Sequence, residues 1–309
     1  MSAASDWVAD VGFGAGWGLV PLLPEPVARA AFQAVGDLAA RREAPTRQLR
    51  ANLRRVLPGA SPAELEAVVR AAMRSYARYW CEAFRLSTMD PAEIHDRMHR
   101  ATIGFEHIVD AVVAGRGVII ALTHSGNWDA TAVWMIEWLR RQGLRPSVAG
   151  VAERLRPESV YRRFVAYREA IGLEVLPMTG GERSPYSVMA SRLNDNGVVA
   201  LLSDRDLSGR GTQVSFFGEP ARLPAGPALL AARTGAALLP LSTWFTPDGW
   251  GVRVKPAVPV PSVRAAREAT QQLADALAAE IADHPCDWHM MQRVWQADMP
   301  AKQARETVP

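Results

Sequence analysis

The stretch VIIALTHSGNWDATAVWMIEWLRR, residues 118–141, decides how this chain folds. Its first six residues, 118–123, are mostly apolar and rich in β-branched side chains, which is typical of a buried strand. From Asn127 to Arg141 the apolar residues recur at helical spacing, and Gly126 lies between the two patterns, where a tight turn is needed. A strand, a turn and a helix in this order predict one unit of an α/β sheet.

The same alternation continues along the rest of the chain. Further strand-like runs lie at residues 147–152, 173–177, 198–203, 237–245 and 250–258. Helical patterns lie between several of them, at residues 158–171, 184–194 and 225–234, and a closing helix is expected at 264–282. We therefore predict an α/β fold with a mixed, partly parallel central sheet flanked by helices.

The first third of the chain carries helical patterns instead, at residues 26–42, 45–57 and 62–86. The pattern changes near residue 117, where the strands begin. We predict a single domain over residues 1–309, with a helical part at 1–100, an α/β core at 101–296 and a loose tail at 297–309.

The composition narrows the class of protein further. The chain has 309 residues, 49% hydrophobic and 22% charged, which suits a folded soluble core and not a disordered chain. The uncharged stretch at 11–24 has only 14 residues with four glycines and two prolines, whereas a spanning helix needs roughly 20 apolar residues. We expect neither a transmembrane span nor a secretory signal.

Basic residues gather in one part of the helical third. Residues 29–56 contain seven arginines and two acidic residues, which gives a local charge of +5, compared with +3 for the whole chain. The arginines are Arg29, Arg41, Arg42, Arg47, Arg50, Arg54 and Arg55. An arginine cluster beside the apolar, tryptophan-bearing segment 7–23 favours a surface that lies on an anionic bilayer. The chain carries no recognised nucleic-acid motif, so we expect no nucleic-acid partner.

Polar residues follow three of the predicted strands. They are the segment from His124 to Asp129, the pair Glu153-Arg154, and Asp204-Arg205-Asp206. In open α/β sheets, ligands bind just beyond the carboxyl ends of the strands, so these positions predict a site.

The spacing of His124 and Asp129 suggests a general base. If the carboxylate accepts a proton from one ring nitrogen, the other nitrogen is free to take a proton from a substrate. The same residues also suit a helix cap beside a packed histidine, and spacing alone does not choose between the two.

Other enzyme classes leave weaker traces. The chain contains no G-x-S-x-G elbow, no P-loop and no G-x-G-x-x-G unit between a strand and a helix. Asp204 and Asp206 after an apolar strand would suit a metal-dependent glycosyltransferase, and they would equally suit carboxylates paired with neighbouring arginines.

At this point the residues resemble a known family. His124-Ser-Gly-Asn-Trp-Asp129 resembles the H-x4-D signature of glycerolipid acyltransferases, in the branch that includes the lipid A acyltransferases. Longer blocks are similar to the actinobacterial enzymes of this family that acylate phosphatidylinositol mannosides. These blocks are DWVADVGFGAGWGLVPLLPEPVA, VAERLRPESVYRRFVAYREAIGLEVLP, SDRDLSGRGTQVSFFGEPARLPAGPALLA and PCDWHMMQRVW.

The resemblance implies an acyl-CoA-dependent O-acyltransferase at the cytoplasmic face of the cell membrane. Such an enzyme moves a long acyl chain, typically palmitoyl, to a mannose hydroxyl of a phosphoinositide glycolipid in the inner leaflet. It uses acyl-CoA as a co-substrate and needs no metal or other cofactor. A lipid A-like or other glycolipid acceptor is an alternative, and so is a peripheral lipid-binding protein without enzymatic activity.

The resemblance also assigns roles to residues. His124 matches the catalytic base and Asp129 its charge-relay partner. The expected substrate-binding residues are Asn127, Glu153, Arg168, Asp204 and Arg205. Among them, Arg168 is expected to meet the acceptor's phosphate, and Asp204 stands where the family leads us to expect a glutamate. Backbone N–H groups of residues 125–127 are candidate donors to the oxyanion of the transition state.

Overall fold

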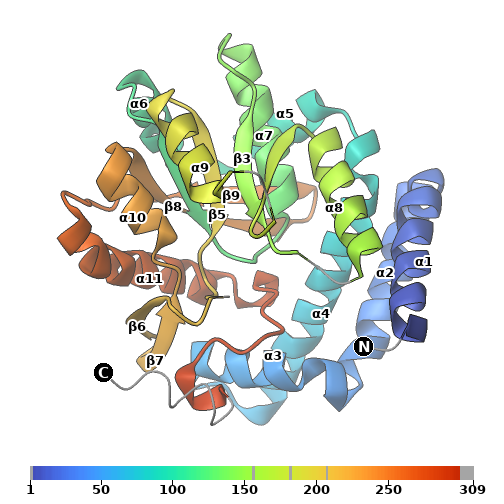
Figure 1. Cartoon of the computed structure of the whole chain (residues 1–309). Helices are drawn as coiled ribbons and strands as arrows, with labels where there is room; N and C mark the ends of the chain where they lie inside the picture. The colour runs from blue at the N-terminus through green and yellow to red at the C-terminus, as the bar shows by residue number, and fades with distance from the viewer. Residues whose placement is uncertain (1–2, 155–156, 181–182, 207, 300–309) are drawn as a thin grey trace.

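The computed structural model describes residues 3–154, 157–180, 183–206 and 208–299 (Figure 1). The helices are α1 (Ala3–Leu19), α2 (Glu25–Ala40), α3 (Glu43–Val56), α4 (Pro62–Arg85), α5 (Pro91–Arg100), α6 (Glu106–Val113), α7 (Trp128–Arg141), α8 (Glu158–Ala170), α9 (Pro185–Asn194), α10 (Gly226–Thr234) and α11 (Ala266–Asp283). The strands are β1 (Thr102–Ile103), β2 (Val118–Leu122), β3 (Val148–Ala152), β4 (Leu173–Pro177), β5 (Val198–Leu202), β6 (Thr212–Phe216), β7 (Glu219–Leu223), β8 (Ala237–Thr246) and β9 (Gly249–Val254).

A seven-stranded sheet forms the centre, in the order β1-β9-β8-β2-β5-β3-β4. All neighbouring strands run parallel except β8 and β9, which form an antiparallel pair. β6 and β7 make a separate antiparallel hairpin. The predicted mixed, partly parallel sheet with flanking helices is confirmed.

Alternation along each strand supplies two apolar layers, because successive strand residues point to opposite faces of a sheet. In β2, Val118, Ile120 and Leu122 face a core shared with α7 and part of α8, whereas Ile119 and Ala121 face a core shared with α9, α10 and α11. Figure 1 shows these two groups of helices on opposite sides of the sheet. All five β2 residues are buried, which explains their continuous apolar run.

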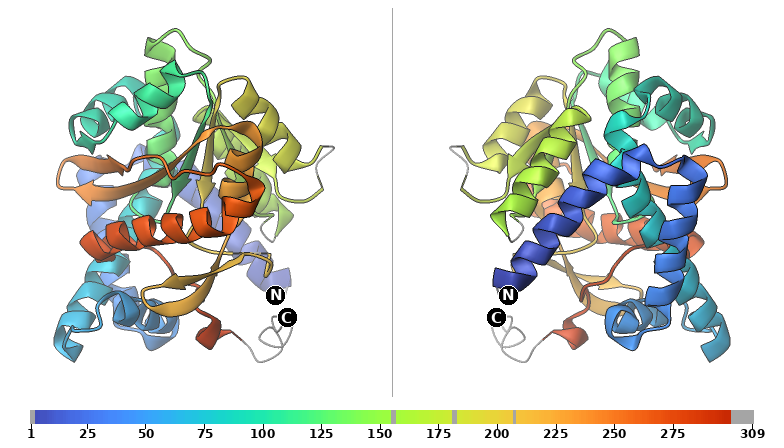
Figure 2. Two further views of the ribbon diagram at one scale, coloured as in Figure 1. Left: turned by 90° about the vertical axis from the view of Figure 1, so that its left-hand side faces the viewer. Right: turned by 90° about the vertical axis from the view of Figure 1, so that its right-hand side faces the viewer.

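The first hundred residues are helical as predicted, and α4 is the helix on which that part is organised. It begins with a capping box, in which Ser61 accepts from the Glu64 N–H and the Glu64 carboxylate accepts from the Ser61 N–H. α2 packs along α4, and α1 lies across α4 and α8 on the same flank (Figure 2, right). Among the described helices, none is long and apolar enough to cross a membrane.

Six strands lie within two residues of their predicted starts, but the prediction was incomplete. It lacked the hairpin β6–β7, the two-residue strand β1 and the bounds of the helices α1, α5 and α6. Most of the predicted loose tail, 300–309, lies outside the described residues. The described beginning of that tail is attached, since Asp298 accepts hydrogen bonds from Gln48 and Arg55 of α3.

Candidate active site

The register between β2 and β5 brings His124 beside Asp204. The two strands pair in parallel with a constant offset, so that Leu122 lies opposite Leu202. His124 and Asp204 each follow two residues later, and they meet at the carboxyl edge of the sheet. The Nδ1 atom of His124 is 2.7 Å from Oδ1 of Asp204. The imidazole is 27% exposed and the carboxylate is fully buried, so a substrate can reach the ring but not its partner.

Asp204 is a buried charge with its hydrogen-bonding capacity filled. Its Oδ2 accepts from the backbone N–H of His124 at 2.9 Å and from the indole N–H of Trp288 at 2.8 Å. Burial alone would favour the protonated acid, but the charge of His124 and these hydrogen bonds outweigh it and hold the pKa of Asp204 below its usual range. Asp204 is therefore ionised at neutral pH and accepts a hydrogen bond from the Nδ1–H of His124.

The predicted hydrogen bond between His124 and Asp129 is wrong in this structure. Asp129 lies in the first turn of α7, 1% exposed, where its Oδ2 accepts from the Tyr79 hydroxyl and its Oδ1 from Nε of Arg168, both at 3.0 Å. The parallel ladder already places Asp204 against the imidazole, and the turn at Gly126 carries Asp129 onto the helix and towards α4 and α8. Asp129 ties these three helices together.

The Asp129–Arg168 ion pair joins a buried carboxylate to a guanidinium side chain that is 20% exposed. Burial would lower the pKa of the Arg168 guanidinium, but the charge of Asp129 raises it above its ordinary value. Arg168 therefore gives its Nε to the protein itself. Its expected contact with an acceptor phosphate stays a prediction.

Asn127 is fully buried and caps α7. Its side-chain oxygen accepts from the N–H of Ala130, and its amide N–H donates to Glu82 of α4. Glu82 also accepts from the indole N–H of Trp250 at 2.7 Å. Both ends of the Asn127 amide thus have protein partners, and the side chain holds the turn at residues 124–127 against α4 and β9. A role for Asn127 in substrate binding stays a prediction.

Glu153 and Arg205 follow β3 and β5, two adjacent strands, and they form an ion pair of 3.1 Å. Glu153 remains about half exposed. The structure thus brings the predicted substrate-binding residues to one edge of the sheet, but it links them in pairs that the sequence did not indicate. A role for Glu153 or Arg205 in substrate binding stays a prediction.

A segment near the C-terminus, residues 287–289, is hydrogen-bonded to the turn at residues 124–127. The Gly126 N–H donates to the carbonyl of Asp287 at 2.9 Å, and the His289 N–H donates to the carbonyl of His124 at 2.8 Å. Gly126 is therefore not a free oxyanion donor, and the candidates among residues 125–127 reduce to Ser125 and Asn127. Gly126 adopts φ +52°, and a Cβ there would lie 2.8 Å from the carbonyl oxygen of Thr243.

His289 is a second histidine next to the site, in a different state. Its Nε2 lies 2.7 Å from the Ser75 hydroxyl, and the residue is 5% exposed. Burial and the nearby charge of His124 lower the pKa of His289 to about 3. It is neutral at physiological pH, whereas His124 has a carboxylate that stabilises its charged form.

Sequence reasoning missed Tyr79, Glu82 and Trp288. Tyr79 and Glu82 lie on a helix whose pattern indicated only packing. Trp288 lies in the PCDWHMM block, which the resemblance contained but to which no role was assigned. The indication that could have found it is a buried tryptophan next to two polar residues, since a buried indole N–H needs an acceptor.

Aromatic side chains of α1, α4 and α8 form a continuous apolar wall behind the α7 turn. Trp17 contacts Phe84 and Phe164 at ring distances of 5.3 and 5.1 Å, and Tyr79 stacks on Trp128 at 4.1 Å. Trp128 in turn lies 5.6 Å from the His124 ring. An acyl-binding groove along these helices stays a prediction.

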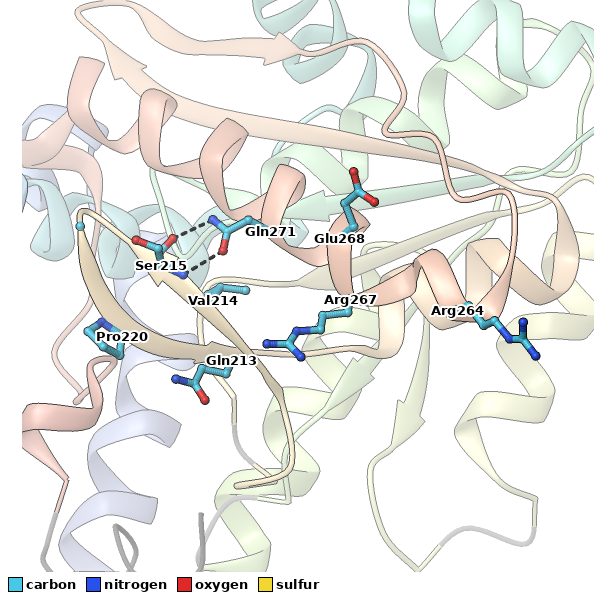
Figure 3. Close-up of a pocket in the computed structure, with 9 residues that line it drawn as sticks. Gln213, Val214, Ser215, Pro220, Arg264, Arg267, Glu268 and Gln271 are labelled. Atoms are coloured by element: carbon cyan, nitrogen blue, oxygen red, sulfur yellow. Dashed lines mark hydrogen bonds between the residues drawn. The ribbon is translucent and has the colours of Figure 1, made fainter. Parts of the chain in front are cut away.

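A separate hollow of about 630 Å³ lies between the hairpin β6–β7 and the start of α11 (Figure 3). Arg264 and Arg267 line it, and Ser215 and Gln271 exchange two hydrogen bonds at its wall. None of the predicted site residues lines this hollow, so it is distinct from the His124 site.

The alternative metal site does not form. Asp204 is committed to His124, and Asp206 accepts from the backbone N–H groups of Ser208 and Gly211 in its own loop. Within the described ranges, no three histidine, cysteine or acidic residues gather as metal ligands. This donor set does not fit the metal-dependent glycosyltransferase hypothesis.

A partly exposed imidazole, held by a buried carboxylate at the carboxyl edge of a mainly parallel sheet, is the arrangement that general base catalysis requires. The chain belongs to the bacterial lipid A biosynthesis acyltransferase family, whose sequence model matches residues 2–297. It is an acyltransferase, and the resemblance seen in the sequence is confirmed.

Two relatives are similar over nearly their whole length. The phosphatidylinositol mannoside acyltransferase of Mycolicibacterium smegmatis is 50% identical over 293 residues, which are 94% of this chain and 93% of that protein. The phosphatidylinositol mannoside acyltransferase of Mycobacterium tuberculosis (strain H37Rv) is 47% identical over 297 residues, 96% of this chain and 90% of that protein.

Proposed function

We propose that this acyltransferase moves a long-chain, palmitoyl-like acyl group from acyl-CoA to a mannose hydroxyl of phosphatidylinositol mannosides. The names of the two relatives, together with the full-length similarity, support the acceptor. The single observation that carries the mechanism is the 2.7 Å contact between His124 and Asp204.

The contact fixes the tautomer of the base. An ionised carboxylate only accepts hydrogen bonds, so Nδ1 of His124 carries the proton and Nε2 presents its lone pair. Because 27% of the His124 side chain is exposed, Nε2 can meet a hydroxyl brought from outside. Asp204 replaces Asp129 as the partner that stabilises the imidazolium.

The reaction then needs no covalent enzyme intermediate. Nε2 takes the proton of the mannose hydroxyl while that oxygen attacks the thioester carbonyl carbon, giving a tetrahedral oxyanion. The oxyanion collapses, the carbon–sulfur bond breaks, and the imidazolium returns the proton to the departing sulfur of CoA. The products are the mannose ester and the free thiol, and His124 is restored to its neutral form.

We propose that the enzyme works while lying on the inner leaflet, at the cytoplasmic face of the membrane, because its acceptor is anchored there. Among the side chains that the structure describes, eight of the thirteen exposed large apolar ones lie on α1, α2 and the turn between them. This docking face consists of Trp7, Val11, Leu19, Leu22, Leu23, Val27, Val35 and Leu38. Figure 2 (right) shows both helices on one flank of the molecule. Such a large exposed apolar area supports contact with a bilayer.

The arginine cluster contributes unequally to this surface. Arg41, Arg42 and Arg70 line a hollow of about 540 Å³ next to the end of α2. Arg55 belongs elsewhere, since Glu219 and Asp298 bind it on the side of the hairpin. We therefore assign attraction to anionic lipid to Arg41 and Arg42 and remove Arg55 from it.

The proposed reaction is tested by incubating the protein with palmitoyl-CoA and phosphatidylinositol mannosides and measuring the mass of the lipid product by mass spectrometry. The native chain is expected to add one palmitoyl mass to the acceptor, and His124→Ala is expected to add none while remaining folded. His107→Ala, on α6 at the opposite end of the strands, is the matched control and keeps full activity. Normal turnover by His124→Ala would remove the mechanism, and acylation of a lipid A-like acceptor alone would change the substrate.

Membrane docking is tested by sedimentation with vesicles that contain anionic lipid. Leu22→Ser combined with Val35→Ser should weaken binding at every salt concentration, because these side chains are 77% and 63% exposed. Arg41→Ser combined with Arg42→Ser should weaken binding mainly at low salt, and Val113→Ser, equally exposed on α6, should have no effect. If none of these four substitutions changes vesicle binding, the proposed docking face is wrong.

A further inference from the structure

Three consecutive residues after α11, at positions 287–289, contact both members of the His124–Asp204 pair. Asp287 ends a short 3-10 turn, and its carbonyl accepts from the Gly126 N–H. His289 donates its N–H to the carbonyl of His124, and Trp288 between them forms a β-bridge with Ser125. The catalytic turn thus gains a strand-like neighbour from a segment more than 160 residues further along the sequence.

The side chain of Trp288 reaches past this backbone contact to Asp204. The indole is fully buried, and its N–H lies 2.8 Å from Oδ2 of the carboxylate. Its rings pack against Phe216 of the hairpin and against Trp295. An indole has a single hydrogen-bond donor, and the donor of Trp288 binds Asp204, the carboxylate that contacts His124.

The two oxygens of Asp204 have different hydrogen-bond partners. Oδ1 faces Nδ1 of His124, and Oδ2 receives two N–H groups, from the His124 backbone and from Trp288. The backbone donor lies on the residue that must be positioned, so it moves with His124. Trp288 is the donor on an independent element, and it fixes the plane of the carboxylate relative to the sheet.

We propose that Trp288 is a positioning residue of the acyl transfer, which acts on His124 by orienting the carboxylate of Asp204 through its indole N–H. The proposal rests on the proposed function, since it assumes that His124 is the base. It predicts that the indole nitrogen matters for turnover, whereas the apolar bulk of Trp288 matters for folding.

Trp295 offers a matched control inside the same apolar cluster. It is also fully buried and also donates its indole N–H at 2.8 Å, but to the backbone carbonyl of Phe216 and not to the site. Replacing either tryptophan by phenylalanine removes one hydrogen bond and similar packing. The two variants therefore share that loss and differ in one further contact each. Trp288 reaches Asp204, whereas Trp295 lies under the guanidinium of Arg55, which a phenylalanine ring at position 295 can still face.

The experiment compares Trp288→Phe, Trp295→Phe and the native chain in palmitoyl-CoA turnover across pH, with melting temperatures measured in parallel. Trp288→Phe is expected to lower kcat by about 10- to 100-fold, the value of a hydrogen bond to a charged group, with little change in the KM for palmitoyl-CoA. The acid limb of its kcat/KM profile should move to higher pH, because a carboxylate with one donor fewer attracts the Nδ1 proton of the His124 imidazolium more strongly and so keeps the base protonated to higher pH. Trp295→Phe should keep kcat and the profile while its melting temperature falls.

Equal kcat and equal pH profiles for the two variants would overturn the proposal, and so would a loss by Trp288→Phe confined to KM. If Trp288→Phe does not fold, benzothienylalanine at position 288 keeps the ring volume and lacks the N–H, and the same loss of kcat is expected. Native kcat with that residue would equally overturn the proposal. A native chain that transfers no acyl group would instead refute the proposed function.

The route of the effect is tested in the background of Asp204→Asn. If Trp288 acts through the carboxylate, adding Trp288→Phe to this variant changes kcat by less than about two-fold. A loss as large as that in the native background would show that Trp288 acts by another route, and would overturn the proposal.

Discussion

Two buried carboxylates flank the catalytic turn, and they are used differently. Asp204, beyond the end of β5, contacts a side chain that can gain or lose a proton. Asp129, in the first turn of α7, contacts Arg168, which keeps its charge at every relevant pH. The first pair can therefore follow a proton through a reaction, whereas the second is a fixed ion pair that joins helices. The H-x4-D signature contains His124 and only the carboxylate of the fixed pair, and both Asp204 and Arg168 lie outside it.

The largest effect is expected from Asp204→Asn. The amide cannot hold Nδ1–H of His124 in the same way, so the base loses both its tautomer and its stabilising charge. Turnover should fall by on the order of 10² to 10⁴-fold, measured as initial rates with palmitoyl-CoA. The melting temperature should change little, because neutral His124 leaves no stranded charge. Asp204→Glu keeps the charge and should recover part of the rate, and unchanged turnover by Asp204→Asn would show that the base acts without this partner.

Asp129→Asn should act first on stability. The change leaves the Arg168 guanidinium, whose side chain is 20% exposed, without its counter-charge. Because water screens part of that charge, the cost should be about 2 to 4 kcal/mol, below the value for a fully buried pair. Urea unfolding measures this cost. Adding Arg168→Gln to the variant removes the stranded charge and should restore part of the loss. If Asp129→Asn instead unfolds like the native chain and loses turnover as severely as Asp204→Asn, the difference between the two carboxylates disappears.

Tyr79→Phe sharpens the same contrast with a smaller effect. It removes one donor from Asp129 at 3.0 Å and leaves the Arg168 contact in place. The expected cost is about 1.5 to 3 kcal/mol of unfolding free energy, the value of a hydrogen bond to a charged group. Tyr76→Phe, on the same helix, is the control and should cost less. Equal costs would mean that the Tyr79 hydroxyl contributes nothing beyond its ring.

The last comparison concerns the slope of stability against pH and His289, a histidine without a carboxylate contact. Its pKa of about 3 in the folded protein lies below the roughly 6.5 of an unfolded histidine. As the pH falls below about 6.5, the unfolded chain therefore binds a proton that the folded chain does not, and stability decreases until about pH 3. His289→Gln should make the decline shallower by up to about 1.4 kcal/mol per pH unit. Parallel unfolding curves from pH 7 to 4 would contradict this.

The fold was largely predictable because each central strand is a short apolar run bounded by turns. The hairpin β6–β7 escaped because its residues alternate between buried and exposed positions over only five residues each, with no apolar run. α5 escaped because its charged residues hide a narrow stripe of Ile94 and Met98. Short elements of this kind are recognisable only against the core that they cover.

The positions of the site residues follow from the local sequence pattern, but their pairing does not; only the family resemblance pointed to a contact between position 204 and His124. Their positions after strands 118–122, 148–152 and 198–202 follow from the local pattern. Which residue faces His124 depends on which strand lies beside β2, and that is a property of the sheet order. The sequence offers Asp129 at five residues' distance, whereas the ladder brings Asp204 from 80 residues away. Trp288 comes from further still, for the same reason.

The fixed register of β2 against β5 has a consequence for how this enzyme can change over evolution. Helices α7, α8 and α9 lie between the two reacting partners along the chain, yet the distance between those partners depends only on the ladder. Connections such as residues 142–147 can therefore lengthen or shorten without altering the chemistry. An insertion of one residue inside β2 or β5 would instead shift His124 relative to Asp204. The two strands must therefore keep their length, whereas the segments that connect them can vary in length.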